Sequence, residues 1–401
     1  SSEKKEHFFF WFIIFISNFF GIMPLRNVLQ PNPSKVKFQL HSIALVWTIF
    51  FLIFGTWRCL LFAQTLIQTG ITPKNIVALI FYVVNISACI LFAILAKRWP
   101  KLLRYWTRVE MIFLLPPYKE PRWSLRRKLN LLSALFFPAE HCLYYASGYY
   151  NYLQKILLCE TDHSKANFRD FIILEQFKDV FGLLPFNLLI AFGGFLLSFT
   201  FTFIWNYMDL FIMLVGVSLA TRFEQFAARM ETLEGLFVSD ALWYDIRQHH
   251  IQLCELMEHV DDHLSSIILM AAMNNMYFIC NQLLNIFTKL RWPINYCYFW
   301  FSLIFLLTRT ASAFLCASAI HDASMAPLKV LYLVPAGYWT EEVQRFAAQL
   351  TNQCIALTGK RFYHITRKNL FGFFSTIVTY ELVLLQLDRN SDKIGLPNLC
   401  D

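Results

Sequence analysis

Residues 39–64 read QLHSIALVWTIFFLIFGTWRCLLFAQ, and Arg58 is the one charged side chain among them, counting histidine as neutral. The hydrocarbon core of a bilayer is about 30 Å thick, which takes about 20 apolar helical residues to cross. The stretch is long enough to cross it. A lone strand of the same composition would leave its backbone groups unpaired in lipid, so the stretch predicts a transmembrane helix.

Six further stretches share this character, in a chain of 401 residues that is 57% apolar and only 15% charged. They lie at 73–96, 129–154, 182–207, 262–288, 295–320 and 370–388. Such a composition is far from that of an average soluble protein. We therefore predict an all-α membrane protein with seven transmembrane helices.

Basic residues are shared unequally among the connections, and in membrane proteins they accumulate on the cytoplasmic side. The 97–128 and 329–368 connections are rich in Lys and Arg, whereas the first and second spans are joined with only Lys74 between them. This bias predicts a cytoplasmic amino terminus and an extracellular carboxyl terminus. A G-protein-coupled receptor has the opposite polarity, which disfavours that class. The net charge of +8 follows from the same bias, and no nucleic-acid partner is predicted.

Three amphipathic patterns continue beyond the predicted bilayer on the inner side. Apolar residues recur every three or four positions through 223–237, 246–260 and 343–357, a spacing typical of helices with one apolar face. We expect these extensions, within 211–261 and 323–368, to form a cytoplasmic anchor that joins subunits. The remaining predicted parts are a cytoplasmic amino-terminal segment (1–38), spans one to four on the ligand-pocket side (39–210), spans five and six (262–322), the last span (369–388) and an extracellular tail (389–401).

The amino-terminal segment contains an aromatic run over residues 8–20 that is too short to span a bilayer;. We expect it to lie on or under the inner leaflet. Of the ten cysteines, four fall in or near the predicted outer half and are able to form disulfides there: Cys142, Cys159, Cys297 and Cys400.

A metal site and an active site are both disfavoured by the residues. His259 and His263 are one helical turn apart, but neither an H-E-x-x-H pattern nor a cysteine pair accompanies them;. A solvated helix face is the simpler interpretation. The sequence also has no glycine-rich phosphate loop and no nucleophile elbow. We predict no enzyme, no metal and no cofactor.

Polar side chains inside spans are costly, so each is a candidate functional residue. Those placed in the outer half suit a neutral carbohydrate, whose hydroxyls bind carboxylates, amides and Arg while its C–H face lies on an aromatic ring. The candidate ligand-binding residues are Tyr82, Glu140, His141, Tyr144, Tyr145, Asn274, Asn275, Trp300 and Arg309. The alternative is a structural Arg309–Glu140 pair with the tyrosines as interface anchors. Arg58 is expected to snorkel toward the surface.

The last span carries the candidate pore and gate residues on one helical face: Thr379, Val383, Gln386 and Leu387, in line with Thr376;. A pore needs polar groups for a hydrated ion and an apolar ring that closes by dewetting. The alternative is that Thr379 and Gln386 only hydrogen-bond a neighbouring helix.

The same span, TIVTYELVLLQL at 376–387, resembles the carboxyl-terminal signature of insect gustatory receptors, which is Thr-Tyr, five mostly hydrophobic residues and Gln-Phe. Thr379, Tyr380 and Gln386 match, while Leu387 replaces the phenylalanine and Glu381 interrupts the apolar stretch. Three further blocks are similar to the sugar-sensing branch: NNMYFICNQLL (274–284), CYFWFSLIFLLTRT (297–310) and EEVQRFAAQLTNQCIALTGKRFYHITRK (341–368).

The resemblance implies a sugar-gated, nonselective cation channel in the plasma membrane of gustatory neurons, on the dendrite or soma. It implies a tetramer, either a homotetramer or a heteromer with related receptors, with a central pore formed by the last span. Mono- or disaccharides would be the ligands and cations the permeant ions. A sugar transporter is a second hypothesis, although no internal repeat is found. A channel gated by an odorant or a bitter compound is a third.

Overall fold

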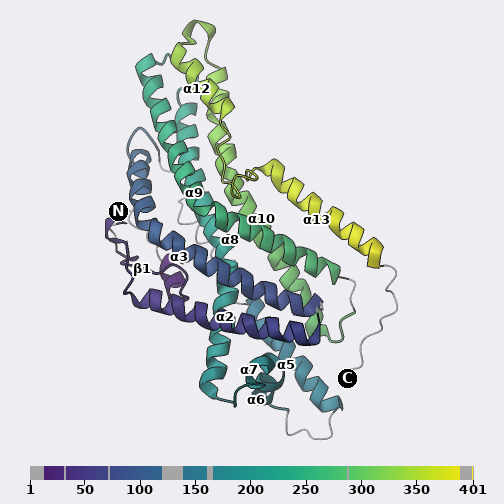
Figure 1. Cartoon of the computed structure of the whole chain (residues 1–401). Helices are drawn as coiled ribbons and strands as arrows, with labels where there is room; N and C mark the ends of the chain where they lie inside the picture. The colour runs from purple at the N-terminus through teal and green to yellow at the C-terminus, as the bar shows by residue number, and fades with distance from the viewer. Residues whose placement is uncertain are drawn as a thin grey trace.

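The computed structural model describes residues 13–30, 33–70, 73–119, 139–159, 166–286, 289–388 and 400. Long helices run side by side through most of this part of the chain (Figure 1). The helices are α2 (Ile43–Thr69), α3 (Pro73–Phe113), α5 (Ala139–Cys159), α6 (Phe168–Phe171), α7 (Lys178–Phe181), α8 (Leu188–Glu231), α9 (Asp240–Leu284), α10 (Pro293–Met325), α11 (Pro327–Tyr332), α12 (Glu341–Asn352) and α13 (Arg367–Asp388). A π turn, η3 (Ile172–Gln176), joins α6 to α7, and 3₁₀ turns occupy η1 (Pro33–Lys35) and η4 (Ala336–Tyr338). Strands β1 (Leu25–Arg26) and β2 (Lys37–Phe38) pair in antiparallel fashion.

Five helices of the described chain are long and apolar enough to cross a membrane: α2, α3, α8, α9 and α10. They contain the predicted spans 39–64, 73–96, 182–207, 262–288 and 295–320 in large part. The predicted spans 129–154 and 370–388 fall on α5 and α13, but residues 120–138 and several side chains beyond Tyr380 lie outside the described part. A seven-span topology therefore stays a prediction.

Side-chain caps mark the starts of the long helices. The side chains of Ser42, Asn187 and Ser239 accept hydrogen bonds from backbone N–H groups in the first turns of α2, α8 and α9. These residue types satisfy N–H groups that have no partner within the helix. From those starts, α8 and α9 run for 44 and 45 residues. The predicted apolar stripes at 223–237 and 246–260 thus lie largely on continuations of the same helices that hold the predicted spans.

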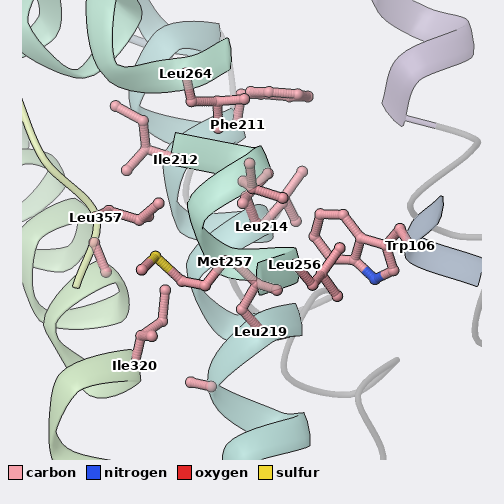
Figure 2. Packing of buried hydrophobic residues seen from close by; sticks show 14 of the residues in the cluster. Trp106, Phe211, Ile212, Leu214, Leu219, Leu256, Met257, Leu264, Ile320 and Leu357 are labelled. Atoms are coloured by element: carbon pink, nitrogen blue, oxygen red, sulfur yellow. The ribbon is translucent and has the colours of Figure 1, made fainter. Parts of the chain in front are cut away.

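The main core lies where α3, α8, α9 and α10 meet. Figure 2 shows Phe211, Leu214 and Leu219 of α8 against Leu256 and Met257 of α9. Gly216 lets α8 and α10 approach closely, since a Cβ there would lie 2.8 Å from the Cys316 carbonyl oxygen and 3.0 Å from Ala317 Cα. Small residues at such positions permit close helix packing in membranes.

The two ends of the bundle differ, and we name them by the helices they hold. At the α12 end, the rings of Phe226, His250 and Phe346 are in contact, with centroids 5.3–6.2 Å apart. Most of the three amphipathic stripes is buried here, although Phe237 is 75% exposed and Cys354 is exposed. At the other end, the α7 end, α7 contacts α2 and α5 contacts α10 (Figure 1).

The aromatic run near the amino terminus is described from Ile13 onward, and part of it belongs to the core. Ile14 and Phe20 are buried, and the Phe20 ring stacks on Phe203 of α8 at a centroid distance of 4.0 Å. Thr48 of α2 also donates to the Gly21 carbonyl at 2.7 Å. These residues pack between helices, and a position of the segment on or under the inner leaflet stays a prediction.

The last helix, α13, lies along one side of the bundle (Figure 1). It contacts the bundle through Phe373, whose ring is 5.0 Å from that of Phe314 on α10, and through Ile377, which is 2% exposed. Beyond it, Cys400 forms a disulfide with Cys159 at the end of α5. Of the four cysteines predicted as able to pair, these two do so, whereas Cys142 and Cys297 are free. The disulfide fixes the chain terminus at the α7 end.

Candidate functional site

A short chain of hydrogen bonds links α9, α10 and α5. Gln282 Nε2 donates to Ser302 Oγ at 3.0 Å, and Ser302 Oγ donates to Glu140 Oε1 at 2.5 Å. Glu140 is 8% exposed, and its second oxygen, like the Gln282 side-chain oxygen, has no hydrogen-bond partner among the described residues. Buried polar atoms are normally paired, so two unpaired acceptors in one place call for an explanation. A hydroxylated ligand would supply the missing donors.

One helical turn along α5 from Glu140 lies a group of aromatic side chains. The Tyr144 ring is 5.3 Å from that of Tyr145 and 5.9 Å from that of Tyr298 on α10. His141 packs edge-on against Tyr145 at 4.9 Å, and its Nδ1 lies 3.1 Å from Thr202 Oγ1 on α8. The structure therefore brings four predicted residues of α5 together with α8 and α10, as an aromatic wall beside a carboxylate.

Tyr82 and Arg58 border this wall from the other side. Tyr82 of α3 is buried and packs against Phe62 and Phe201, with centroids 5.2 and 5.5 Å away. Arg58 of α2 is 2% exposed, and its Nη1 lies 3.3 Å from Asp179 Oδ2 on α7. The expectation that Arg58 snorkels is therefore wrong, since a partner on α7 holds its charge inside the protein.

The predicted Arg309–Glu140 pair is replaced by another. Arg309 Nε on α10 lies 2.7 Å from Asp209 Oδ2 on α8, and both side chains are 2% exposed. Asn275 of α9 donates to both Asp209 oxygens at 2.9 and 3.1 Å and accepts from Arg309 Nη2 at 3.2 Å. Arg309 also donates to Asn206. Breaking such a buried pair on one side costs about 3–5 kcal/mol, because the remaining charge is left without compensation.

Asp209 was missed because the predicted span ended at residue 207, which placed the carboxylate outside the bilayer. The signal was present in the sequence: Asp209 stands alone in WNYMDLFIMLVG (205–216), with long apolar runs on either side. A lone acid within an apolar helix points to a buried partner. The helix continues well past 207, and Asp209 faces α9 and α10.

The predicted set thus divides into two groups along α10. Ser302 and Arg309 are seven residues apart, which places them on the same helical face about 10 Å from each other along the axis. The group at Ser302 holds Glu140 and the aromatic wall, and the group at Arg309 holds Asn275. A cavity of about 10 Å³ adjoins the second group, and its wall includes Asp209, Asn275, Phe314 and Ile365. That volume is roughly what one water molecule needs.

Two predicted residues make no hydrogen bond to either group within the described chain. Trp300 is 45% exposed, and it stands two residues from Ser302, a rotation of about 200° to the far face of α10. Asn274 is 4% exposed and its Nδ2 has no hydrogen-bond partner within the described chain. Sequence spacing alone did not settle how α10 is rotated about its axis.

On α13, the predicted pore face points away from the protein's own bundle. Thr379 is exposed and Val383 is 50% exposed, and the Thr376 and Thr379 hydroxyls donate to backbone carbonyls one turn earlier, at 2.9 Å each. The side chains of Gln386 and Leu387 lie outside the described part of the structure. Phe371 and Val378 are also exposed, at 75% and 56%. The helix thus presents a broad, mainly apolar surface beyond the bundle.

The histidines considered for a metal are used otherwise. His259 Nδ1 and His263 Nδ1 each lie within 2.8 Å of a backbone carbonyl one turn earlier, and His249 Nδ1 lies 2.8 Å from the Tyr118 hydroxyl. Among the described residues, His, Cys, Asp and Glu side chains form no group of three that would hold a metal ion.

Comparison with known proteins places the chain among receptors. The model of the trehalose receptor family matches residues 9–400. Two proteins of Drosophila melanogaster cover most of the chain: the gustatory receptor for sugar taste 61a is 48% identical over 381 residues, 94% of this chain and 87% of the relative. The gustatory receptor for sugar taste 64a is 42% identical over 390 residues, 96% and 85% of the two chains.

A solved structure agrees in fold. The insect olfactory receptor OR5 from Machilis hrabei, in complex with eugenol, matches with a TM-score of 0.63 and 15% identity, over 94% of this chain and 97% of that one. At this identity the likeness concerns the fold alone. The family match, the sugar-taste relatives and the apolar helices lead to one conclusion: the chain is a multi-pass membrane protein of the insect gustatory receptor family, in its sugar-receptor branch.

Proposed function

We propose that the protein is a sugar-gated, nonselective cation channel that acts as a sweet-taste receptor in the plasma membrane of gustatory neurons. Sugar binds between α5, α9 and α10 on the extracellular side. Four subunits surround a pore lined by α13, with Thr379, Val383, Gln386 and Leu387 as pore and gate residues. The extensions at the α12 end lie in the cytoplasm and hold the subunits together.

The observation that carries the sugar proposal is the Gln282–Ser302–Glu140 chain with its two unpaired acceptors. Sugar hydroxyls donate to such acceptors, and the adjacent rings of Tyr144 and Tyr298 offer apolar faces for the C–H side of a sugar ring. The names of the relatives point the same way, since both are called receptors for sugar taste. A ligand without hydroxyls would leave these buried oxygens unpaired, at a cost of about 1–3 kcal/mol each.

Support for the pore comes from the uncovered face of α13. Exposed threonine hydroxyls and Val383 lie on the side turned away from the bundle, which leaves them free to face a symmetry axis. A hydrated ion needs polar groups along its path, and an apolar ring can close that path by dewetting. Subunit contacts would cover the rest of the exposed apolar surface.

The proposed sugar site and the proposed pore are coupled along one face of α10. Ser302 contacts Glu140 near the aromatic wall, and Arg309 lies two turns further along in the Asp209 network. Ile365, next to that network, lies two residues before α13, and Leu306 packs in one cluster with Ile377 of α13. Sugar shifts the channel toward opening only by the difference between its affinities for the open and closed states.

The Cys159–Cys400 disulfide supports the proposed orientation. Disulfides persist in oxidising surroundings such as the cell exterior, so the α7 end belongs outside and the α12 end inside. The Lys- and Arg-rich connections give the same polarity;.

The proposal is tested by reconstituting the purified protein in lipid without any G protein and applying sugar under voltage clamp. Sugar-evoked cation current supports it. Accumulation of labelled sugar without current would identify a transporter instead. A response to apolar odorants or bitter compounds but to no sugar would identify a related channel with another ligand.

A further inference from the structure

One exposed face of α3 changes from apolar to basic within a single helical turn. Its first part consists of apolar side chains that are 45–48% exposed: Val83, Ile90 and Ile94. Its second part consists of exposed basic side chains, which we name the basic stripe: Lys97, Lys101, Arg104 and Arg108. Neighbouring members are three, four or seven residues apart, so all of them lie on one side of the helix. The buried side chains of Trp99 and Trp106 lie on the opposite side;.

The change occurs at the level where the apolar surface of α2 also ends. The two helices follow one another in the chain and pack side by side (Figure 1). Ile43 stands as many residues before the end of α2 as Trp99 stands after the start of α3, so the two lie at about the same height;. Ile43 and Val46 are 85% and 63% exposed, as expected of apolar side chains that meet lipid tails;. The basic stripe therefore begins where the lipid tails end, at the depth of the phosphate headgroups.

The β1–β2 hairpin adds cations at the same level. It ends at Phe38, shortly before α2 begins, and both η1 and β2 contact α3. Arg26, Lys35 and Lys37 are exposed on it. Two segments that are far apart in the chain thus bring basic side chains to one boundary of the membrane.

Few carboxylates oppose this charge. Glu110 is the one acidic residue between positions 7 and 119, and its buried side chain pairs with Arg222 of α8. On the neighbouring helix α9, Glu255 accepts a hydrogen bond from the Tyr105 hydroxyl at 3.1 Å, at the flank of the stripe. None of the four stripe residues forms an ion pair with another residue of the described chain. Their charges are therefore available to a partner outside this chain.

The spacing of the stripe suits a headgroup with more than one phosphate. Lys97, Lys101 and Arg104 lie within about 10 Å of each other along the helix axis. A lipid with one net negative charge is neutralised by one of these side chains, whereas an inositol ring with several phosphates is able to contact all of them. Arg104 also offers paired donors to phosphate oxygens. The acyl chains of the same lipid would lie against Ile90 and Ile94, on the apolar part of the face.

We propose that the basic stripe of α3 binds a phosphoinositide of the inner leaflet, with the inositol phosphates held by Lys97, Lys101 and Arg104. Arg108 and the cations of the hairpin add attraction at longer range, which falls off within a Debye length. The α12 end must then face the cytoplasm, which is the orientation of the proposed function. Sugar gating is not required for this binding.

The test measures binding of a fluorescent, short-chain phosphatidylinositol bisphosphate to the purified full-length protein in detergent, by fluorescence polarisation. Lys97→Gln, Lys101→Gln and Arg104→Gln combined should weaken binding about 10- to 100-fold, because three charges beside the headgroup are lost. Unlabelled phosphatidylserine of the same chain length should compete with the probe at least about tenfold less well. Free inositol trisphosphate should also compete at least about tenfold less well, since it cannot use the apolar part of the face.

Two combined variants serve as controls. Lys329→Gln, Lys360→Gln and Lys368→Gln remove the same charge from exposed positions of the other basic connection, and binding should change less than about threefold;. Lys97→Arg, Lys101→Arg and Arg104→Lys keep every charge of the stripe, so binding should again stay within about threefold. The second control separates the loss of charge from any effect of the substitutions on folding.

Unchanged binding in the stripe variant, or an equal loss in the first control, would overturn the site. Competition by phosphatidylserine as strong as that of the phosphoinositide would reduce the stripe to the ordinary charge bias of the inner side. Equal competition by inositol trisphosphate would show that a soluble phosphate, not a lipid, is the ligand. If the unaltered protein binds the probe but gives no current with any sugar, the proposed function fails and the lipid site stands.

Discussion

Arg309 on α10 forms its ion pair with Asp209 on α8, with 2.7 Å between Nε and Oδ2, and both side chains are shielded from solvent. The pair lies among α8, α9 and α10, next to Ile365, which stands shortly before α13. The pair lies between the Glu140 group and the last helix, so we propose that Arg309 transmits the effect of ligand binding, whereas the sequence predicted that Arg309 contacts the ligand.

Removing one member of this pair should destabilise the protein strongly. Arg309→Gln and Asp209→Asn each leave a buried group uncompensated, and we expect a loss of about 3–5 kcal/mol from each. The double variant should lose less than the sum, because no lone charge remains. Thermal unfolding of the detergent-solubilised protein measures this. The exposed Arg345–Glu341 pair is the control, for which Arg345→Gln should cost about 0–1 kcal/mol;. Additive losses in the double variant would contradict the coupling.

Replacing Glu140 should weaken sugar responses more than replacing Trp300. Glu140→Gln converts the acceptor of the Ser302 hydroxyl into an amide, and we expect the half-maximal sugar concentration to rise at least about tenfold;. Trp300→Ala, on the far face of α10, should change it less than about twofold by the same reasoning. Dose–response curves of sugar-evoked current measure the half-maximal concentration of each variant. Equal effects of the two changes would place the ligand elsewhere.

Cysteine substitutions on α13 should show whether the face with Thr379 and Val383 lines the pore. Thr379→Cys and Val383→Cys place a thiol on the face turned from the bundle, so a charged thiol reagent applied during sugar should reduce the current. Ile377→Cys is the control, since Ile377 is packed in its own bundle and 2% exposed. Modification at residue 379 or 383 that leaves conduction unaltered would remove this face from the pore.

The disulfide offers a test of orientation. Cys400→Ser frees Cys159 at the end of α5, and a membrane-impermeant maleimide added to intact cells should then label it. The free, exposed Cys142 and Cys297 set the background of labelling in unaltered protein, and labelling above that background should appear there only after reduction, because Cys159 and Cys400 are otherwise joined. Labelling of the variant only in permeabilised cells would reverse the proposed topology.

Much of the fold could be predicted from hydropathy, because helix length and bilayer thickness are linked directly. The five apolar helices are among the seven predicted spans, and residue spacing predicted an apolar face on each of the helical extensions that meet at Phe226 and Phe346. Rotation of a helix about its axis did not follow, so the burial of Ser302 and the exposure of Trp300 on the same helix were not predicted. The partners of buried charges did not follow either. Arg58 and Arg309 found carboxylates on α7 and α8, and only three-dimensional packing selects among the acids available.

The length of α9 has a mechanical consequence. Its 45 residues form one continuous helix of about 68 Å, which ends near Gln282 on one side and reaches past the ring of His250 on the other. Such a rod acts as a lever: a tilt of about 3° at the sugar end would displace the opposite tip by roughly 3.5 Å at this length. A small motion at the end near Gln282 is thus large enough to rearrange side-chain packing at the distant end.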